Sequence, residues 1–357
     1  MVNDRVFVIA EAGVNHNGDS DLAFQLVDVA AEAGADAVKF QTFSTERIVT
    51  RDALKAPYQR KATDTGDSQF EMLASLELSY KTHRDLKKYS EARGLQFMST
   101  AFDVESLKFL VSDLQLELLK IPSGELTNGP LLLEYAKSGR DLILSTGMST
   151  TSEIREALAL LAFGLAGGRD PSVEGHLGVT ISEKGQSRLK DQVVLLHCTT
   201  EYPAPPESIN LRAIGSMRDE FELRVGYSDH SLGISIPCAA VALGSRVIEK
   251  HFTLDKCLSG PDHSSSLEPA ELRAMVESIR IIELAQGDGV KEPHKVEIRN
   301  RNSARKSLVA SRNIACGETF TVENLDVKRP GTGRSPMTYW SILGTRASKQ
   351  YQLDELI

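Results

Sequence analysis

The sequence predicts an α/β chain in which a (β/α)8 TIM barrel is followed by a small C-terminal domain. Eight short apolar runs recur along roughly the first three quarters of the chain, and such runs are typical of parallel strands buried on both faces. With their polar ends, they span residues 6–13, 37–43, 95–103, 118–125, 142–148, 193–203, 224–230 and 247–253. Because the carboxyl ends of all strands meet at one face of a parallel barrel, we expect these polar ends to form one active site.

Helix-start and helix-stop signals fall between the runs, as a repeat of strands and helices requires. Asp19 can cap a helix that ends near Gly34. Thr150 and Glu153 have the spacing of a capping box, in which each side chain binds the other residue's backbone amide. Pro269 stands where a first helical turn would begin, since no amide hydrogen is needed there. These signals support helices between the predicted strands.

Three stretches depart from a bare repeat. We expect residues 44–78 to form a loop over the barrel mouth and residues 164–192 to be a surface insert without regular periodicity. Gly287, Asp288 and Gly289 then break the pattern. The predicted organisation is therefore a barrel domain (1–286), a linker (287–300) and a small module (301–357). A module of roughly sixty residues is marginal alone, so we expect it to pack against this barrel or a neighbour's barrel.

Charge and composition exclude several classes of partner. The chain has 357 residues and a formal net charge of −8, which argues against nucleic acid or an anionic membrane. Its four cysteines are far apart and form no CxxC pair, so thiols are expected rather than disulfides. No apolar stretch approaches the roughly 20 residues that span a bilayer, and no signal-peptide run follows Met1. We therefore expect a cytoplasmic protein.

Two histidines close the seventh and eighth predicted strands. His230 and His251 would be neighbours at the barrel rim, where two imidazoles could converge on one divalent cation and leave positions for substrate and water. The alternative is that one or both only form hydrogen bonds within the barrel top. His197 lies earlier in its strand, and we expect a structural role for it.

Cationic and hydroxyl side chains gather at the same predicted face. Two lysines, Lys39 and Lys120, end buried strands. The hydroxyl residues are Thr100, Ser123, Ser145, Thr200 and Ser228. Ammonium and hydroxyl donors satisfy anionic oxygens, so this set suits a small polyanion that carries phosphate and carboxylate. Two alternatives stay open: internal pairing of the lysines with Glu11 or Glu125, and a Schiff-base lysine.

Two carboxylates are further candidates. Glu125 follows a tight Pro-Ser-Gly sequence that would turn its side chain into the pocket, where it could transfer a proton or hold a substrate hydroxyl. Asp262 lies on the loop after the eighth strand. It can either reach the pocket or act only as a turn residue, because Gly-Pro-Asp favours a turn.

Seven segments of the barrel region resemble bacterial sialic acid synthases. They read IAEAGVNHNG (9–18), VKFQ (38–41), KIPSGE (120–125), LSTGM (144–148), HCTTEYP (197–203), GYSDH (226–230) and EKHF (249–252). The small module, with VKRPG at 327–331, is similar to the antifreeze-like (SAF) domain that ends those enzymes. The likeness covers essentially the whole chain except residues 164–192.

The resemblance implies a barrel that condenses phosphoenolpyruvate with an N-acetylated mannose-type sugar, releasing phosphate and a nine-carbon 2-keto acid. The residues implied for phosphoenolpyruvate are Lys39, Gln41, Thr100, Lys120, Ser123, Ser145, Thr200 and Ser228. Those implied for the sugar are Tyr202, Glu125, Asp262 and Arg329, and those for a Mn²⁺ or Mg²⁺ ion are His230 and His251. Glu125, Lys120 and Glu11 would be the catalytic residues.

Arg329 takes its role only from the resemblance, since Arg-Pro-Gly in a small module otherwise indicates an exposed turn. In that family the antifreeze-like domain of one subunit covers the other subunit's barrel, and the matching arginine binds the N-acetyl group of the sugar. The resemblance therefore implies a domain-swapped homodimer.

The identity of the sugar is a narrower expectation. The segments 55–59 and 9–19 look more like enzymes that make N,N'-diacetyllegionaminate from a 2,4-diacetamido-6-deoxy sugar than like those that make N-acetylneuraminate from N-acetylmannosamine. Two alternatives stay open. One is a phosphoenolpyruvate-dependent synthase that acts on a phosphorylated aldose, and the other is a non-catalytic carbohydrate-binding protein.

Overall fold

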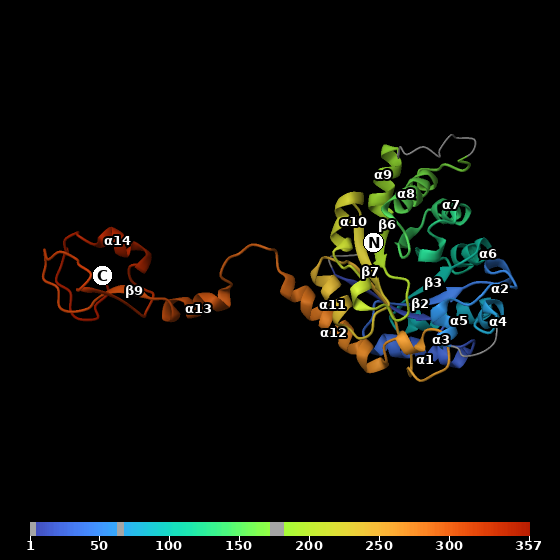
Figure 1. The fold of residues 1–357 in the computed structure, drawn as a ribbon, viewed down its shortest axis with the longest axis horizontal. Helices are drawn as coiled ribbons and strands as arrows, with labels where there is room; N and C mark the ends of the chain where they lie inside the picture. Colours follow the sequence, from blue (N-terminus) through green and yellow to red (C-terminus); the bar gives the residue numbers. More distant parts are fainter. Residues whose placement is uncertain (1–4, 63–67, 172–181) are drawn as a thin grey trace. The chain divides into compact units, whose positions relative to one another are not determined.

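Eight parallel strands close into a barrel in the computed structural model of the chain, which describes residues 5–62, 68–171 and 182–357 (Figure 1). The strands pair in chain order, and β1 pairs with β8 to complete the barrel. They are β1 (Phe7–Gly13), β2 (Ala37–Thr42), β3 (Gln96–Ala101), β4 (Leu118–Ile121), β5 (Asp141–Ser145), β6 (Val193–Cys198), β7 (Arg224–Asp229) and β8 (Val247–His251). The prediction of a (β/α)8 barrel is confirmed, with each strand ending within its predicted run.

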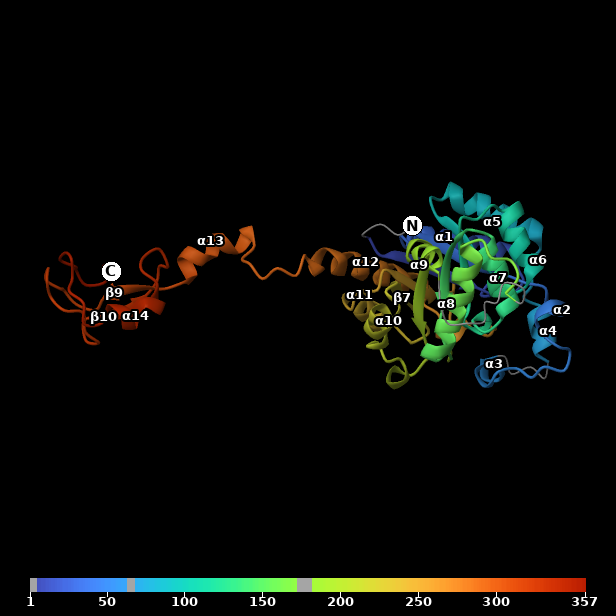
Figure 2. The same cartoon turned by 90° about the horizontal axis from the view of Figure 1, so that it is seen from above.

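Helices cover the outside of this barrel (Figures 1 and 2). They are α1 (Ser20–Glu32), α5 (Tyr80–Ala92), α6 (Val104–Lys108), α7 (Gly129–Lys137), α8 (Thr151–Leu165), α9 (Glu183–Gln192), α10 (Ala213–Phe221), α11 (Ser235–Ala242) and α12 (Pro269–Gln286). The main hydrophobic core lies between these helices and the outward faces of the strands, as the alternation of side chains along a strand requires. Burial of this apolar layer is the dominant force that closes the barrel.

The inward faces of the strands carry two different kinds of side chain. A separate apolar cluster fills the lower barrel interior; its buried members are Ile9, Ala37, Met98, Leu118, Ile143, Val194, Leu196 and Val247. Residues two positions later on a strand share its face but lie nearer its carboxyl end. At those positions the chain has Glu11, Lys39, Thr100, Lys120 and Glu249, all buried. The strand register therefore sets a polar layer directly on top of an apolar one.

Three local signals form the structures that the sequence predicts. The Asp19 side chain accepts from two backbone amides at the start of α1. Thr150 and Glu153 form both hydrogen bonds of a capping box at the start of α8. Pro269 lies in the first turn of α12. Each of these signals satisfies or removes a backbone donor that a helix start would otherwise leave unpaired.

Two expectations about loops need correction. Residues 44–78 contain α2 (Thr45–Ile48), α3 (Pro57–Ala62) and α4 (Gln69–Ala74), and Figure 2 shows α3 set apart from the barrel helices. A capping box between Ser68 and Glu71 starts α4, a signal that the sequence contained. The expected insert 164–192 ends in α9, which buries Leu189 against the barrel. Its residues 172–181 lie outside the described residues.

The chain divides into two compact units, Met1–Gly287 and Asp288–Ile357. The second unit begins with α13 (Lys295–Ala304), so the later part of the expected linker is helical. An antiparallel pair, β9 (Ser307–Ala310) and β10 (Leu325–Lys328), then packs with α14 (Tyr339–Ile342). The buried core of this unit consists of Leu308, Ala310, Ile314, Phe320, Leu325, Ile342, Ala347 and Tyr351.

All four cysteines are free thiols, as their spacing predicts. None of the helices in the described ranges is both long and apolar enough to cross a bilayer.

Candidate active site

A buried charge network lies at the carboxyl ends of β1, β2 and β8. The Lys39 ammonium forms an ion pair and hydrogen bond with the Glu11 carboxylate. Its Nζ also lies 3.1 Å from Thr100 Oγ1 and 3.6 Å from Glu249 Oε2. Internal pairing of Lys39 with Glu11, one of the two alternatives for this lysine, is therefore present. Lys39 lies in the polar layer above the apolar barrel interior, where its side chain is almost fully buried.

Glu249 connects this network to the second lysine. Lys120 Nζ lies 3.5 Å from Glu249 Oε1 and 3.2 Å from the Ile121 carbonyl oxygen. The Ser228 hydroxyl donates to the same Glu249 oxygen at 3.0 Å. Glu125 is not the partner of Lys120; it accepts a hydrogen bond of 2.7 Å from Asn128 instead. Glu249 was missed as a site residue, although it lies two positions before His251 and therefore on the same strand face.

Burial and neighbouring charges act in opposite directions on these groups. Burial alone would raise the pKa of Glu11, but the charges of His251, Lys39 and Lys120 outweigh it and hold that pKa well below its usual range. Burial would lower the pKa of Lys39, but Glu11 and Glu249 raise it above its usual value. For Lys120 burial prevails over Glu249 and the pKa is lowered. The cost of burying the Lys120 ammonium is thus less fully offset by carboxylates than that of Lys39. An anionic ligand would therefore stabilise the charged form of Lys120 more.

Two hydroxyl groups, at the end of β5 and just after β6, lack partners. Ser145 Oγ and Thr200 Oγ1 are buried without a hydrogen bond among the described residues. The Gly147 backbone N–H donates to Ser123 Oγ at 2.9 Å. A Cβ atom at Gly147 would lie 2.2 Å from Thr200 Oγ1 and 2.8 Å from Ser123 Oγ, so only glycine leaves room here. Because a buried hydroxyl is costly when unpaired, these groups indicate a ligand with several acceptor oxygens.

The two candidate metal ligands are neighbours at the rim. The His230 and His251 ring centroids are 5.7 Å apart. His230 Nδ1 lies 2.7 Å from the Thr199 carbonyl oxygen, so it carries the hydrogen and leaves Nε2 available in the neutral ring. His251 Nε2 lies 3.4 Å from Glu11 Oε2, and its buried Nδ1 forms no hydrogen bond and lies 4.0 Å from Asp262 Oδ2. This donor set fits a divalent cation bound by two imidazoles.

The described parts of the chain contain no group of three or more His, Cys, Asp or Glu residues arranged to hold a metal ion. A cation bound by His230 and His251 would therefore need substrate or water for its remaining positions, as in sites that bind substrate directly.

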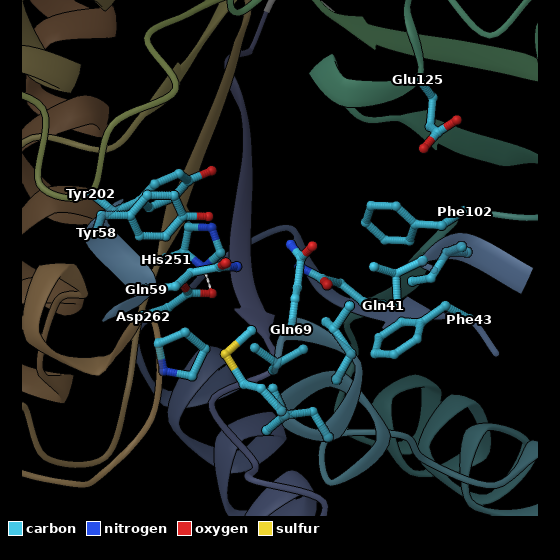
Figure 3. Close-up of a pocket in the computed structure, with 17 residues that line it drawn as sticks. Gln41, Phe43, Tyr58, Gln59, Gln69, Phe102, Glu125, Tyr202, His251 and Asp262 are labelled. Carbon is cyan, nitrogen blue, oxygen red and sulfur yellow. Dashed lines mark ion pairs between the residues drawn. The ribbon is translucent and has the colours of Figure 1, made fainter. Parts of the chain in front are cut away.

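A pocket of about 260 Å³ opens beside this network (Figure 3). Its lining includes five residues that the sequence placed in the site: Gln41, Glu125, Tyr202, His251 and Asp262. Figure 3 shows Tyr202, His251 and Asp262 together on one side, with Tyr58 and Gln59 of α3 beside them. Gln69 of α4 lies between the two sides. The α3 and α4 residues were missed because their segment was expected to be a loop without assigned contacts.

The two candidate carboxylates face the pocket in different settings. Burial raises the pKa of Glu125 above its usual value, and the hydrogen bond from Asn128 opposes this. Burial also raises the pKa of Asp262, although the charge of His251 opposes it. The Asp262 side chain forms no capping hydrogen bond to the short helix that follows it. The turn role proposed as its alternative is therefore performed by its backbone, and its carboxylate points to the pocket.

Two other singled-out residues lie elsewhere. His197 Nε2 contacts the Ile209 carbonyl oxygen at 2.6 Å, which fits the structural role expected for it. Arg329 follows β10 in the second unit, where its side chain is exposed.

Comparison with known proteins identifies the family. Residues 26–291 match the NeuB family. The chain belongs to the NeuB family. Residues 305–357 match the SAF domain, so the expected antifreeze-like module is confirmed. The match covers both the barrel and the module that follows it, in the order that the motifs predict.

Curated relatives cover almost the whole chain. An N,N'-diacetyllegionaminic acid synthase of Campylobacter jejuni is 48% identical over 353 residues, 99% of each chain. One of Legionella pneumophila is 45% identical, over 96% of this chain and 90% of its own. The human N-acetylneuraminate-9-phosphate synthase is 34% identical over 98% of this chain and 91% of its own. The legionaminic acid synthases are thus nearer in sequence than the human enzyme.

A solved structure supports the assignment of the chain to this family. The N-acetylneuraminic acid synthetase of Leptospira borgpetersenii, in complex with citrate, superposes with a TM-score of 0.65. It is 34% identical, and the match covers 84% of this chain and 92% of that one.

Proposed function

We propose that this protein is an N,N'-diacetyllegionaminic acid synthase, which joins phosphoenolpyruvate to a 2,4-diacetamido-6-deoxy sugar and releases phosphate. The observation that carries the proposal is a pair of buried lysines at the same barrel face as buried hydroxyl groups that lack partners. The near full-length similarity to two legionaminic acid synthases favours this product over N-acetylneuraminate.

Phosphoenolpyruvate would bind over the β2 to β7 strand ends. The phosphate oxygens would accept from the unpaired Ser145 and Thr200 hydroxyls and from Lys120, which burial leaves under-compensated. The carboxylate would lie toward Lys39 and Thr100. These ammonium and hydroxyl donors are held in place before the substrate arrives. They can therefore stabilise the charge that develops in the transition state without first reorganising.

The sugar would occupy the pocket beside Tyr202, Glu125 and Asp262. A Mn²⁺ or Mg²⁺ ion held by His230 and His251 would supply polarisation of the open-chain aldehyde. The new bond joins C3 of phosphoenolpyruvate to the aldehyde carbon, water adds at C2, and the resulting tetrahedral intermediate loses phosphate. Glu125 is the proposed proton carrier, because its raised pKa brings it nearer to neutral pH. Holding both substrates in register supplies much of the acceleration.

Phosphate release from phosphoenolpyruvate tests the proposal. The purified chain is incubated with Mn²⁺ and either N-acetylmannosamine or the 2,4-diacetamido-6-deoxy sugar, with and without EDTA. We expect chelator-sensitive release with both sugars and a preference for the second. Absence of release with either sugar would contradict the synthase proposal, whereas binding of sugar without turnover would favour a non-catalytic carbohydrate-binding protein.

We also propose that the active form is a domain-swapped homodimer located in the cytoplasm. The exposed Arg329 of one subunit would bind the N-acetyl group of the sugar in the other subunit's barrel. Arg329→Ala and Lys120→Ala are each expected to be nearly inactive. Mixed under conditions of subunit exchange, they should recover activity, up to about a quarter of the wild-type rate in a random mixture, because some sites then carry both native residues. A mixture that exchanges subunits, as shown by differently tagged chains, but stays inactive would exclude action in trans.

A further inference from the structure

One wall of the pocket is apolar and comes largely from the segment outside the barrel repeat. Ile48 ends α2, and Met72, Leu73 and Leu76 come from α4 and the turn after it. Phe43 and Phe102, which follow β2 and β3, complete the wall, with their rings edge to face at a centroid distance of 6.1 Å. Figure 3 shows both phenylalanines on the opposite side of the pocket from Tyr202 and His251.

This wall is held rigidly. Val14, Phe43, Met72 and Leu76 form a buried cluster of their own. The capping box between Ser68 and Glu71 fixes the start of α4. A packed apolar surface of this kind cannot rearrange to offer a hydrogen bond to a polar group placed against it. The wall therefore favours an apolar group of the ligand over a polar group at the same place.

Charge gives a second, independent constraint. Among the described residues that line the pocket, none is lysine or arginine, and the carboxylates Glu125 and Asp262 both face it. A phosphorylated sugar end in this pocket would find no cation among these lining residues, so its desolvated charge would be uncompensated. The phosphate of phosphoenolpyruvate is not in this position, because its proposed lysines lie in the barrel interior.

We propose that one apolar wall of the pocket selects an acceptor sugar whose C6 end is a methyl group rather than a free or phosphorylated hydroxymethyl group. The wall is formed by Ile48, Met72, Leu73, Leu76, Phe43 and Phe102. The inference rests on the proposed function. If the proposed cation at His230 and His251 holds the aldehyde end of the sugar, the far end would face Phe43 and Phe102, which lie across the pocket from His251 (Figure 3). Met72 is the central specificity-determining residue, since it belongs to both the lining and the buried cluster.

Three acceptors that differ only at C6 test the selection: N-acetylmannosamine, its 6-deoxy analogue and its 6-phosphate. We expect the full-length chain to use the 6-deoxy sugar with a kcat/KM about 10- to 100-fold above that of N-acetylmannosamine, and to use the 6-phosphate least. Release with none of the three, and none with the 2,4-diacetamido sugar, would mean that the proposed function fails. Turnover of all three within about threefold, or preference for the 6-phosphate, would overturn the selection alone.

Variants locate the selection in the wall. The selectivity is the kcat/KM for the 6-deoxy sugar divided by that for N-acetylmannosamine. Met72→Gln is expected to reduce this ratio at least fivefold, because it puts an amide against the methyl group of the sugar. Met72→Leu should keep the ratio. The ratio is measured within one preparation, so it does not depend on the fraction of folded protein. Unchanged selectivity in Met72→Gln would remove Met72 from the proposal.

A second pair guards against misfolding of Met72→Gln. Ile48 is a half-buried residue of the wall and is replaced with threonine. The control is Ile282→Thr, at a half-buried position of α12 outside the pocket lining. Only Ile48→Thr should lower the ratio. Equal ratios in these two variants would contradict a role for the wall.

Discussion

Replacing Lys39 with methionine is expected to lower kcat/KM for phosphoenolpyruvate by about 10²- to 10³-fold. Methionine has a similar length but no charge and no donor, so the phosphoenolpyruvate carboxylate would lose its proposed ammonium partner. The change also leaves the Glu11 carboxylate without its hydrogen bond from Lys39, which adds repulsion toward an anionic substrate. Initial rates of phosphate release over a range of phosphoenolpyruvate concentrations measure the effect.

A matched control is available in the same barrel. Lys250 is buried as deeply as Lys39, at 1% and 2% exposure, and its strand β8 is adjacent to β1. Its ammonium pairs with Asp229 on the outward face, away from the pocket. Lys250→Met should therefore keep kcat/KM, per folded molecule, within a few fold of wild type. Loss of activity in Lys250→Met equal to that in Lys39→Met would show that removal of a buried charge, not loss of a ligand contact, causes the defect.

Lys250→Met is instead expected to lower the free energy of unfolding by about 3–5 kcal/mol, because it leaves a buried carboxylate without its counter-ion. Asp229 is fully buried and keeps hydrogen bonds from the Tyr227 hydroxyl at 2.9 Å and the Ser231 hydroxyl at 2.8 Å. Lys250 also donates to the Ser231 carbonyl oxygen at 2.6 Å, and methionine leaves this acceptor unpaired. Urea unfolding followed by circular dichroism measures the change.

The double variant Lys250→Met with Asp229→Asn separates the charge from the packing. Neutralising the carboxylate should recover part of the lost stability, because no unpaired charge is then buried. If the double variant is no more stable than Lys250→Met, the loss arises from packing and the missing hydrogen bond to Ser231. A loss below about 1 kcal/mol in the single variant would mean that water reaches Asp229.

The eight strands could be predicted because each is an apolar run that ends in polar residues, a pattern that depends only on local sequence. The same holds for the caps at Asp19 and Thr150, whose hydrogen bonds join residues close in sequence. Residues 44–78 were harder, because α2, α3 and α4 are short and the cluster that holds α4 includes Val14 and Phe102, which are far away in the sequence. Short helices have little stability of their own, so local sequence alone seldom determines them.

The contrast between Lys39 and Lys250 shows what the local sequence does not predict, namely which face of its strand a lysine occupies. Both are lysines within apolar, buried strands, and both lie in motifs that resemble the same family. Side chains alternate along a strand, so one lysine faces the barrel interior and the other faces the helices, and the face depends on strand register. Glu249 was missed for a different reason: its strand face follows from its spacing to His251, but its partners Lys39, Lys120 and Ser228 come from three other strands.

By itself the sequence determined the order of strands, the (β/α)8 class, the family, and the candidate residues at the strand ends, because these depend on periodicity and on contiguous motifs. Only the tertiary structure decided that Glu249 joins the two lysines, that Ser145 and Thr200 lack partners, and that α4 supplies an apolar wall to the pocket. These features are contacts between segments far apart in the chain. They exist only once barrel closure has set the register of all eight strands.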